Sequence, residues 1–140
     1  GAGLDAQELA LLSSQMVERR IARGEFVFRR GEAGDAMYVS LQGPIGIWLP
    51  AGESGGGRRM VTYAPGVAFG EIGLLQGRPR SADAIAEDDA VVLELHRAGY
   101  ERIGVEHPAL LAKMLLNLGL LLASRVRALT DELETLHGRH

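Results

Sequence analysis

Glycine content constrains this chain more than any other feature of its sequence: 19 of its 140 residues are glycine, against 5 prolines. Glycine inside a helix costs about 0.5–1 kcal/mol relative to alanine, so an all-helical bundle is not the simplest interpretation. The glycines follow no collagen-like period, and they separate short apolar segments. This pattern predicts many tight turns and therefore many short strands.

Length and composition exclude several classes of protein. A chain of this length fits one domain, expected over residues 4–140, and we interpret residues 1–3 as an expression remnant or a linker end. The absence of cysteine excludes a disulfide scaffold, a thiolate metal site and a cysteine nucleophile. A formal net charge of -3 argues against nucleic acid as a partner, because that binding needs clustered positive charge. Lys113 is the single lysine among 15 basic residues, so an arginine alone is weak evidence of function.

A helix is expected at the start of the chain, from Asp5 to about Arg20. Asp5 and Glu8 have the spacing of a capping box. Apolar residues then recur at helical spacing, at Leu9, Leu12 and Met16.

The middle of the chain, about residues 24–96, is expected to form a barrel. After Gly24 the helical spacing gives way to short apolar segments divided by glycine turns. Pro44 lacks an N–H and would need an edge or bulge position. Strands this short and numerous favour a closed or jelly-roll barrel. We expect about seven or eight antiparallel strands, including 26–28, 37–41, 45–49, 58–63, 81–86 and 90–95, with a short apolar block at 69–76.

Two helices are expected after the barrel, within about residues 97–137. The first is short and is broken at Gly104, and Pro108 suits the first position of the second. A helix from Pro108 to Leu136 would be about 43 Å long, more than a small barrel needs as cover. Its near-heptad stripe fits either a core and barrel lid or, in its distal part, a dimer seam: Leu111, Leu115, Leu118, Leu122, Val126, Leu129, Leu133 and Leu136.

Catalytic and metal-binding patterns are missing from the sequence. Its four histidines have no metal-ligand spacing, and its serines include no Gly-x-Ser-x-Gly elbow. The loop 52–57 is rich in glycine but lacks the Gly-Lys-Ser/Thr ending of a phosphate loop, so we interpret it as a mobile hairpin tip. We therefore expect no catalytic residue and no metal site.

The segment 69–82 is an exception, because its residue types suggest a binding site. Gly70 and Gly73 allow a close backbone approach and a sharp entry into one helical turn, whose first amides could bind an anion. Arg80 could complete a phosphate pocket with its fork of donors, and Ser81 could add a hydroxyl. Glu71 would repel a phosphate unless it faced another part of the ligand, such as a ribose hydroxyl. The residue types suggest a sugar phosphate or nucleotide; the alternative is a glycine turn with a surface Glu–Arg pair.

These residues resemble the phosphate-binding cassette of the cyclic nucleotide-binding domain family. The cassette-like residues are Phe69 to Leu75 followed by Pro79 to Ala82, and the upstream segment 30–39 with Gly43 is similar to the first hairpin of that family. Two motifs in the right order make the resemblance specific, and it covers essentially the whole chain. It implies a mainly β fold with flanking α: a double-stranded β-helix (jelly-roll) barrel with an N-terminal helix, a short helix and a long C-terminal helix.

The resemblance also implies a set of binding residues. Arg80 would pair with the cyclic phosphate, Glu71 with Gly70 would hold the ribose 2′-hydroxyl, and the amides of Gly73 and Ser81 would reach the phosphate. The family's cassette thus corresponds to Gly70, Glu71, Ile72, Gly73, Arg80, Ser81 and Ala82. A gapless register with the catabolite-activator type gives Arg125 and Val126 as base contacts, with Val61 and Leu74 as apolar neighbours; the other interpretation of Arg125 is a surface arginine.

The resemblance implies that the protein is a regulatory sensor and not an enzyme. The ligand would be cAMP or cGMP, with cAMP favoured because Ser81 stands where members preferring cGMP tend to carry threonine, and no cofactor is expected. The expected partner is a larger, cytoplasmic host chain or the cytoplasmic tail of a membrane transporter or channel, with a homodimer through the C-terminal helix as a further option. The alternative is a ligand-free domain of the same fold that dimerises or docks.

Overall fold

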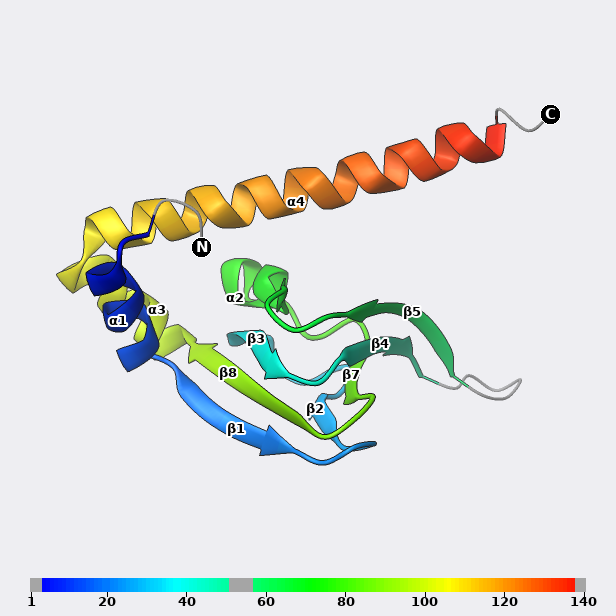
Figure 1. Ribbon diagram of the computed structural model, residues 1–140, viewed down its shortest axis with the longest axis horizontal. Helices are drawn as coiled ribbons and strands as arrows, with labels where there is room; N and C mark the ends of the chain where they lie inside the picture. Colours follow the sequence, from blue (N-terminus) through cyan, green and yellow to red (C-terminus); the bar gives the residue numbers. More distant parts are fainter. Residues whose placement is uncertain (1–3, 51–56, 138–140) are drawn as a thin grey trace.

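Two antiparallel sheets form the barrel in the computed structural model, which describes residues 4–50 and 57–137 (Figure 1). One sheet has the order β1 (Val17–Ile21), β8 (Ala90–His96), β3 (Ala36–Gln42) and β6 (Ala68–Phe69). The other has the order β2 (Phe26–Phe28), β7 (Asp83–Ala86), β4 (Ile45–Leu49) and β5 (Arg58–Tyr63). The predicted jelly-roll barrel with flanking helices is confirmed. The expected hairpin tip lies outside the described residues, apart from Gly57.

The barrel encloses one apolar core, to which both sheets contribute. Tyr38, Phe69 and Val92 come from the first sheet, and Phe28 and Ile45 come from the second. Each of these side chains is at most 7% exposed. The rings of Tyr38 and Phe69 stack at 5.3 Å between centroids. The rings of Phe28, Tyr38 and Phe69 thus pack against one another within this core.

A second core joins the barrel to the helices α1 (Ala6–Ser14), α3 (Arg97–Glu106) and α4 (Pro108–His137). Met37 and Leu95 point outward from their strands and pack against the helices, because successive residues of a strand face opposite sides. Leu74, from α2 (Glu71–Gln76), is fully buried in the same cluster. Lys113 of α4 pairs with Glu8 of α1 at 2.7 Å.

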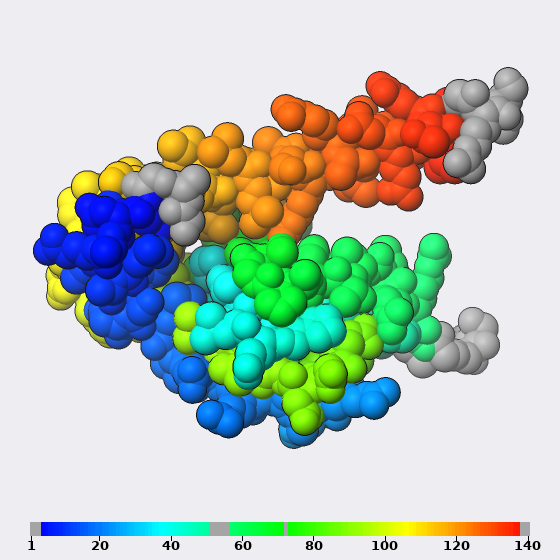
Figure 2. All heavy atoms as spheres, in the orientation of Figure 1, coloured from blue at the N-terminus to red at the C-terminus, as the bar shows by residue number. Residues whose placement is uncertain are grey.

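The long helix α4 is covered over its first part only. Leu110, Met114 and Leu118 are 3–6% exposed, whereas the apolar residues of the last part are more than half exposed: Val126, Leu129, Leu133 and Leu136. Figure 2 shows the distal part, orange to red, standing away from the barrel. By length and composition alone α4 could cross a membrane, with a mean hydropathy of 1.6 over 18 residues of which 17% are buried. The same composition suits a helix that packs in a core or against another helix.

The expected first helix was too long. The capping box at Asp5 and Glu8 is present, but α1 ends at Ser14 and the chain turns into β1. Val17 to Ile21 pair in register with β8, so the barrel begins at Val17 and not near residue 24. Sheet pairing overrides local helical spacing here, since the edge of β8 needs hydrogen-bond partners.

The predicted break at Gly104 is also wrong. The helix α3 continues through Gly104 to Glu106, and a Cβ at Gly104 would lie 3.1 Å from Leu111 Cδ2. This glycine therefore makes room for a side chain of α4. The helix ends instead at Glu106, because the next residue, His107, has a φ of −137° and is followed by Pro108.

The glycine and the proline near β4 have separate local explanations. Pro44 lies just before β4 and outside its pairing, so its missing N–H costs no ladder bond. Gly46 lies within the strand, and a Cβ there would meet Glu87 Oε1 at 2.0 Å. The missing side chain thus leaves space for the Glu87 carboxylate to lie against β4.

Candidate functional site: a cavity between the barrel, α2 and α4

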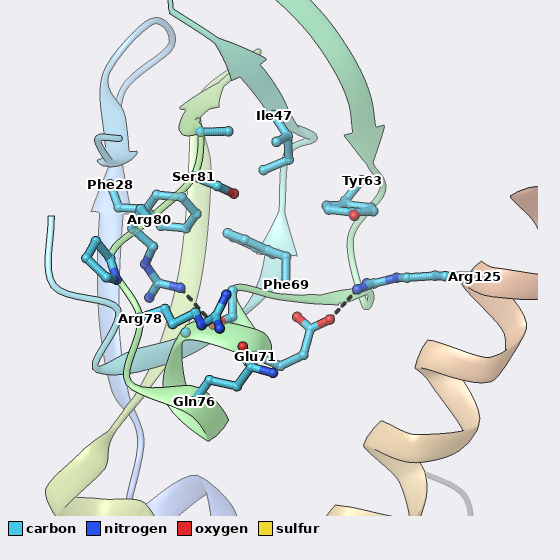
Figure 3. Close-up of a pocket in the computed structure, with 14 residues that line it drawn as sticks. Phe28, Ile47, Tyr63, Phe69, Glu71, Gln76, Arg78, Arg80, Ser81 and Arg125 are labelled. Atoms are coloured by element: carbon cyan, nitrogen blue, oxygen red, sulfur yellow. Dashed lines mark hydrogen bonds and ion pairs between the residues drawn. The ribbon is translucent and has the colours of Figure 1, made fainter. Parts of the chain in front are cut away.

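A cavity of about 350 Å³ opens between the end of the barrel, α2 and α4 (Figure 3). The barrel supplies an apolar wall that consists of Phe28, Ile47, Tyr63, Phe69 and Ala82. Polar groups come from α2, from the segment that follows it and from α4: Glu71, Gln76, Arg78, Arg80, Ser81 and Arg125. A concave apolar site with a few convergent polar groups is typical of a small-molecule pocket.

Arg80 is the central cation of this cavity and is only 6% exposed. Its Nη1 donates to the Gly70 carbonyl at 2.7 Å, and its Nη2 donates to the Ala36 carbonyl. The guanidinium carbon lies 4.3 Å from the ring centroid of Phe28, a cation–π distance. Its Nε is buried and has no hydrogen-bond partner among the described residues. An unpaired buried N–H costs about 1–3 kcal/mol, so this guanidinium has unused capacity to bind an anion.

The loop between β2 and β3 fixes the backbone of Arg80. The Gly31 amide donates to the Arg80 carbonyl at 2.8 Å, and the Arg80 amide donates to the Glu32 carbonyl at 2.9 Å. Two bonds on one residue hold its main chain in a single register. The segment 30–39 thus supports the cassette directly, which its sequence similarity alone does not reveal.

The two cassette glycines allow Arg80 to come close to α2. Gly70 has a φ of +76°, in the left-handed region, and a Cβ there would lie 2.9 Å from Arg80 Nη1. A Cβ at Gly73 would lie 2.7 Å from the same atom and 3.0 Å from the Cα of Gly34. Both positions therefore require glycine even without a ligand, because an added methyl group would displace the guanidinium or the backbone.

Glu71 and Arg125 form an ion pair between α2 and α4 (Figure 3). Glu71 is 2% exposed, and Arg125 Nη1 donates to its Oε1. The other guanidinium nitrogen, Nη2, donates to the Ala68 carbonyl, and the guanidinium carbon lies 4.8 Å from the Tyr63 ring centroid. The alternative of a surface Glu–Arg pair in a glycine turn is thus wrong: Glu71 and Arg80 are both buried, and the partner of Glu71 is Arg125.

The structure brings most of the predicted binding residues together. The cavity is lined by Gly70, Glu71, Gly73, Arg80, Ser81, Ala82 and Arg125. Leu74 is not a neighbour of this space, because its side chain is fully buried in the second core. Val61 and Val126 are 39% and 63% exposed and do not line the cavity. The side chain of Ile72 lies outside the described part of the chain.

Several lining residues were missed by the sequence analysis, above all Tyr63 and Phe28. Alternation along β5 puts Tyr63 on the same face as Val61, and this periodicity is a signal that could have found Tyr63. Tyr63 lies at the end of the strand nearer α4, and selecting it requires knowing where α4 crosses the barrel. Phe28 belongs to a strand that is remote in sequence from the cassette, and no local signal marks it.

Comparison with known proteins decides the family. The model of the cyclic nucleotide-binding domain matches residues 18–107. The chain belongs to this family. The domain is 33% identical over 134 residues to the cyclic AMP receptor protein of Thermus thermophilus, covering 96% of this chain and 60% of that protein. The crystal structure of the catabolite activator protein of Thermus thermophilus matches with a TM-score of 0.79 over 96% of the domain and 61% of that chain.

Two further matches show how varied the relatives are. Glutaminase 1 of Bradyrhizobium diazoefficiens is 34% identical over 124 residues, which cover 89% of the domain and 19% of that enzyme. A structure described as part of a cyclic-GMP-dependent signalling pathway in bacterial phytopathogenesis is 32% identical, with a TM-score of 0.67 over 93% of the domain and 98% of that chain. The chain thus spans less than two thirds of the length of the cyclic AMP receptor protein and of glutaminase 1.

Proposed function

We propose that the domain senses a cyclic nucleotide, with cAMP preferred over cGMP, and passes the signal on through α4. The observation that supports this most is Arg80: a buried guanidinium with an unpaired Nε, in a cavity whose other end carries the buried Glu71. The Arg80 guanidinium matches the cyclic phosphate of such a ligand, and the Glu71 carboxylate matches its ribose.

Four polar residues of the cavity have a role in the proposed complex: Arg80, Ser81, Glu71 and Arg125. Arg80 binds the phosphate together with the amides of Gly73 and Ser81, because charge-assisted bonds to backbone and guanidinium donors suit an oxyanion. Glu71 accepts a hydrogen bond from the ribose 2′-hydroxyl. The purine lies toward the apolar wall, beside Tyr63 and Arg125, the two groups that contact each other at the other end of the cavity.

Calorimetry with cAMP tests the proposal most directly. Charge-assisted hydrogen bonds are worth about 1.5–3 kcal/mol each, and loss of Arg80 would also leave the phosphate charge uncompensated. We expect Arg80→Leu to nearly abolish binding. The matched control is Arg30→Leu, an exposed arginine outside the cavity, which should bind as the wild type does. Unchanged cAMP affinity in Arg80→Leu would overturn the assignment.

The preference for cAMP rests on Ser81, which lines the cavity beside Arg80. Members that prefer cGMP tend to carry threonine there, whose hydroxyl can reach the guanine amino group. We expect a lower dissociation constant for cAMP than for cGMP, and Ser81→Thr to narrow the difference. A tighter complex of the wild type with cGMP would reverse this preference without affecting the proposed site.

The route from ligand to host runs through Arg125, which touches Glu71 and Ala68 from α4. A ligand that engages Glu71 changes the surroundings of Arg125. If the ligand binds more tightly when α4 is in one of two positions, it shifts the helix toward that position. The host would be a larger cytoplasmic chain, or a transporter or channel for which this domain is a cytoplasmic tail. No nucleic-acid contact and no catalysis by the domain itself are proposed.

The distal part of α4 suits a second copy of the chain. Leu122, Val126, Leu129, Leu133 and Leu136 follow one another at intervals of 4, 3, 4 and 3 residues, the spacing of a coiled-coil seam. We expect a dimer at high protein concentration, measured by light scattering, and Leu129→Glu to be monomeric. A wild type that stays monomeric at millimolar concentration would leave α4 to the host chain.

The second candidate function is a ligand-free domain that only docks or dimerises. It is favoured by the exposed apolar face of α4, which needs no nucleotide to be used. Thermal shift separates the two candidates, since a ligand that binds the native state raises Tm by mass action. A rise with cAMP supports the sensor, and no rise at millimolar cAMP and cGMP supports the docking domain.

A further inference from the structure

One buried carboxylate has no part in the proposed nucleotide contacts. Glu94 is 6% exposed and lies on the inner face of β8, in line with the core residues Ala90 and Val92. Removing a carboxylate from water costs several kcal/mol unless partners compensate. An apolar residue would continue the core at this position, so the charge indicates a task beyond packing.

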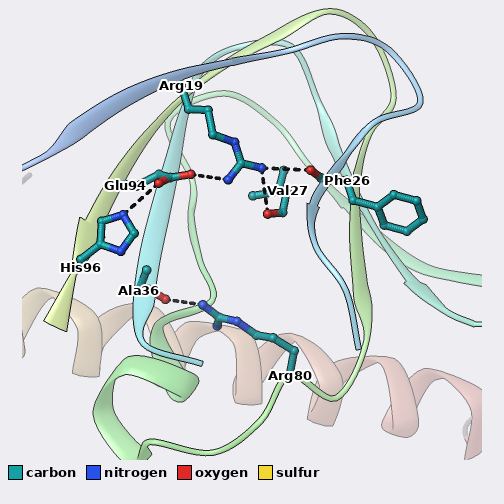
Figure 4. A network of polar contacts seen from close by, with 7 residues as sticks. All are labelled: Arg19, Phe26, Val27, Ala36, Arg80, Glu94 and His96. Carbon is teal, nitrogen blue, oxygen red and sulfur yellow. Dashed lines mark hydrogen bonds and ion pairs between the residues drawn. The ribbon is translucent and has the colours of Figure 1, made fainter. Parts of the chain in front are cut away.

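The partners of Glu94 join the two sheets of the barrel (Figure 4). Arg19 of β1 donates from Nη1 to Glu94 Oε1 at 2.6 Å, and His96 Nε2 lies 2.9 Å from Glu94 Oε2. The same arginine donates from Nη2 to the carbonyls of Phe26 at 2.9 Å and Val27 at 2.8 Å, in β2 of the other sheet. Arg19 thus fixes β2, the strand that ends at Phe28.

Both ends of this cluster connect through the backbone to residues whose rings flank Arg80. The Phe28 ring lies 4.3 Å from the Arg80 guanidinium carbon, and the Tyr38 ring lies 5.5 Å from it. Tyr38 is the direct cross-strand partner of Glu94. Burial raises the pKa of the Tyr38 hydroxyl above its usual range; the charge of Arg80 opposes this rise and the charge of Glu94 adds to it. Tyr38 therefore lies between the cluster and the phosphate-binding arginine.

We propose that Glu94 and Arg19 are positioning residues for Arg80. They hold Phe28 through β2 and Tyr38 through β3, and these two rings set the direction in which the guanidinium points into the cavity. Neither residue touches the ligand. The link to nucleotide affinity rests on the proposed function, whereas the link to the orientation of Arg80 does not.

The first test needs no ligand. The Nε–Hε resonance of Arg80, assigned by its loss in Arg80→Lys, is followed by NMR in Glu94→Gln, an isosteric change that removes the charge. We expect it to shift or broaden. The matched control is Glu87→Gln, which removes the carboxylate that Arg59 contacts at 2.9 Å without touching Arg80, and it should leave the resonance in place. An unmoved Arg80 resonance in Glu94→Gln overturns the proposal.

The second test measures binding of cAMP and of its two phosphorothioate epimers, which place sulfur on opposite exocyclic positions of the phosphate. Glu94→Gln should weaken cAMP about three- to tenfold, the range of one altered hydrogen bond, and should change the ratio of the two epimer affinities. Glu87→Gln should keep both within twofold. An equal loss for cAMP and both epimers means general destabilisation and overturns the proposal.

The proposal can still be tested in two cases where one of these experiments fails. If Glu94→Gln does not fold, Arg19→Lys takes its place, because lysine keeps the charge but cannot donate to the carboxylate and two carbonyls in a fork. If the wild type binds no nucleotide, the proposed function fails, and the NMR result still decides whether Glu94 and Arg19 position Arg80.

Discussion

The two parts of α4 are both rich in apolar residues and have opposite surroundings. Leu110, Met114 and Leu118 are buried against the barrel and α3, whereas Leu133 and Leu136 are 59% and 54% exposed. Arg125 lies at the boundary and contacts the cavity. An apolar face on a helix does not specify its own partner. Apolar residues of one helix are core at one end of α4 and exposed at the other.

The largest expected effect is a difference in the free energy of unfolding between variants in the buried part and in the exposed part of α4. Leu118→Ala should lower the free energy of unfolding by about 2–5 kcal/mol, because it leaves a cavity in the second core. Leu133→Ala is the control and should stay within about 0.5 kcal/mol, since an exposed side chain loses little packing. Urea denaturation at a concentration where the domain is monomeric measures both. Equal losses would mean that the distal part is also covered within one chain.

A glycine of the cassette and a glycine of α4 should change stability with opposite sign when each is replaced by alanine. Gly73→Ala places a methyl group 2.7 Å from Arg80 Nη1, and overpacking of this kind costs about 1–3 kcal/mol. Gly119→Ala places one in open space on α4 and should stabilise by about 0.5–1 kcal/mol. Thermal unfolding of the two variants checks the signs. A stable Gly73→Ala variant that binds cAMP normally would show that Arg80 can move aside at no cost.

The smallest expected effect concerns the boundary itself. Arg125→Ala should weaken cAMP by a few-fold to tenfold, about 0.5–1.4 kcal/mol, because Glu71 loses the partner that orients it toward the ribose. Arg127→Ala, an exposed arginine two residues further along α4, should have no effect. Calorimetry distinguishes three results: weaker binding supports this role, no change means that Arg125 does not contribute to nucleotide affinity, and tighter binding means that Arg125 competes with the ribose for Glu71.

Local sequence signals predicted the parts of the fold that are locally determined. The bounds of β4 and β5 match the expected strands, since glycine turns and a glycine-rich loop delimit them on each side. The strand β1 was missed because the helical spacing of Leu9, Leu12 and Met16 was extended to about Arg20, and only pairing with β8 makes Val17–Ile21 a strand. Gly104 gave a false break because its space is filled by Leu111 of another helix.

The residues of the site also divide into those that a local sequence signal predicts and those that only the folded barrel brings together. Arg80 and Glu71 were predicted because the cassette is contiguous in sequence and its residue types carry the chemistry. Arg125 was expected at the base, but its contact with Glu71 depends on where a helix 54 residues further on crosses the cavity. Phe28 and Tyr63 come from separate strands, and only the closed barrel brings them to the same wall.

The long overhang of α4 also makes it a lever. Leu118 is its last buried residue, Arg125 lies about 10 Å beyond it along the axis, and His137 lies about 28 Å beyond it at 1.5 Å per residue. If the helix pivots as a rod at Leu118, a displacement at Arg125 is amplified about 2.7-fold at the far end. A change of one ångström at the edge of the cavity would then move the tip by nearly three, enough to change which groups meet on a neighbouring surface.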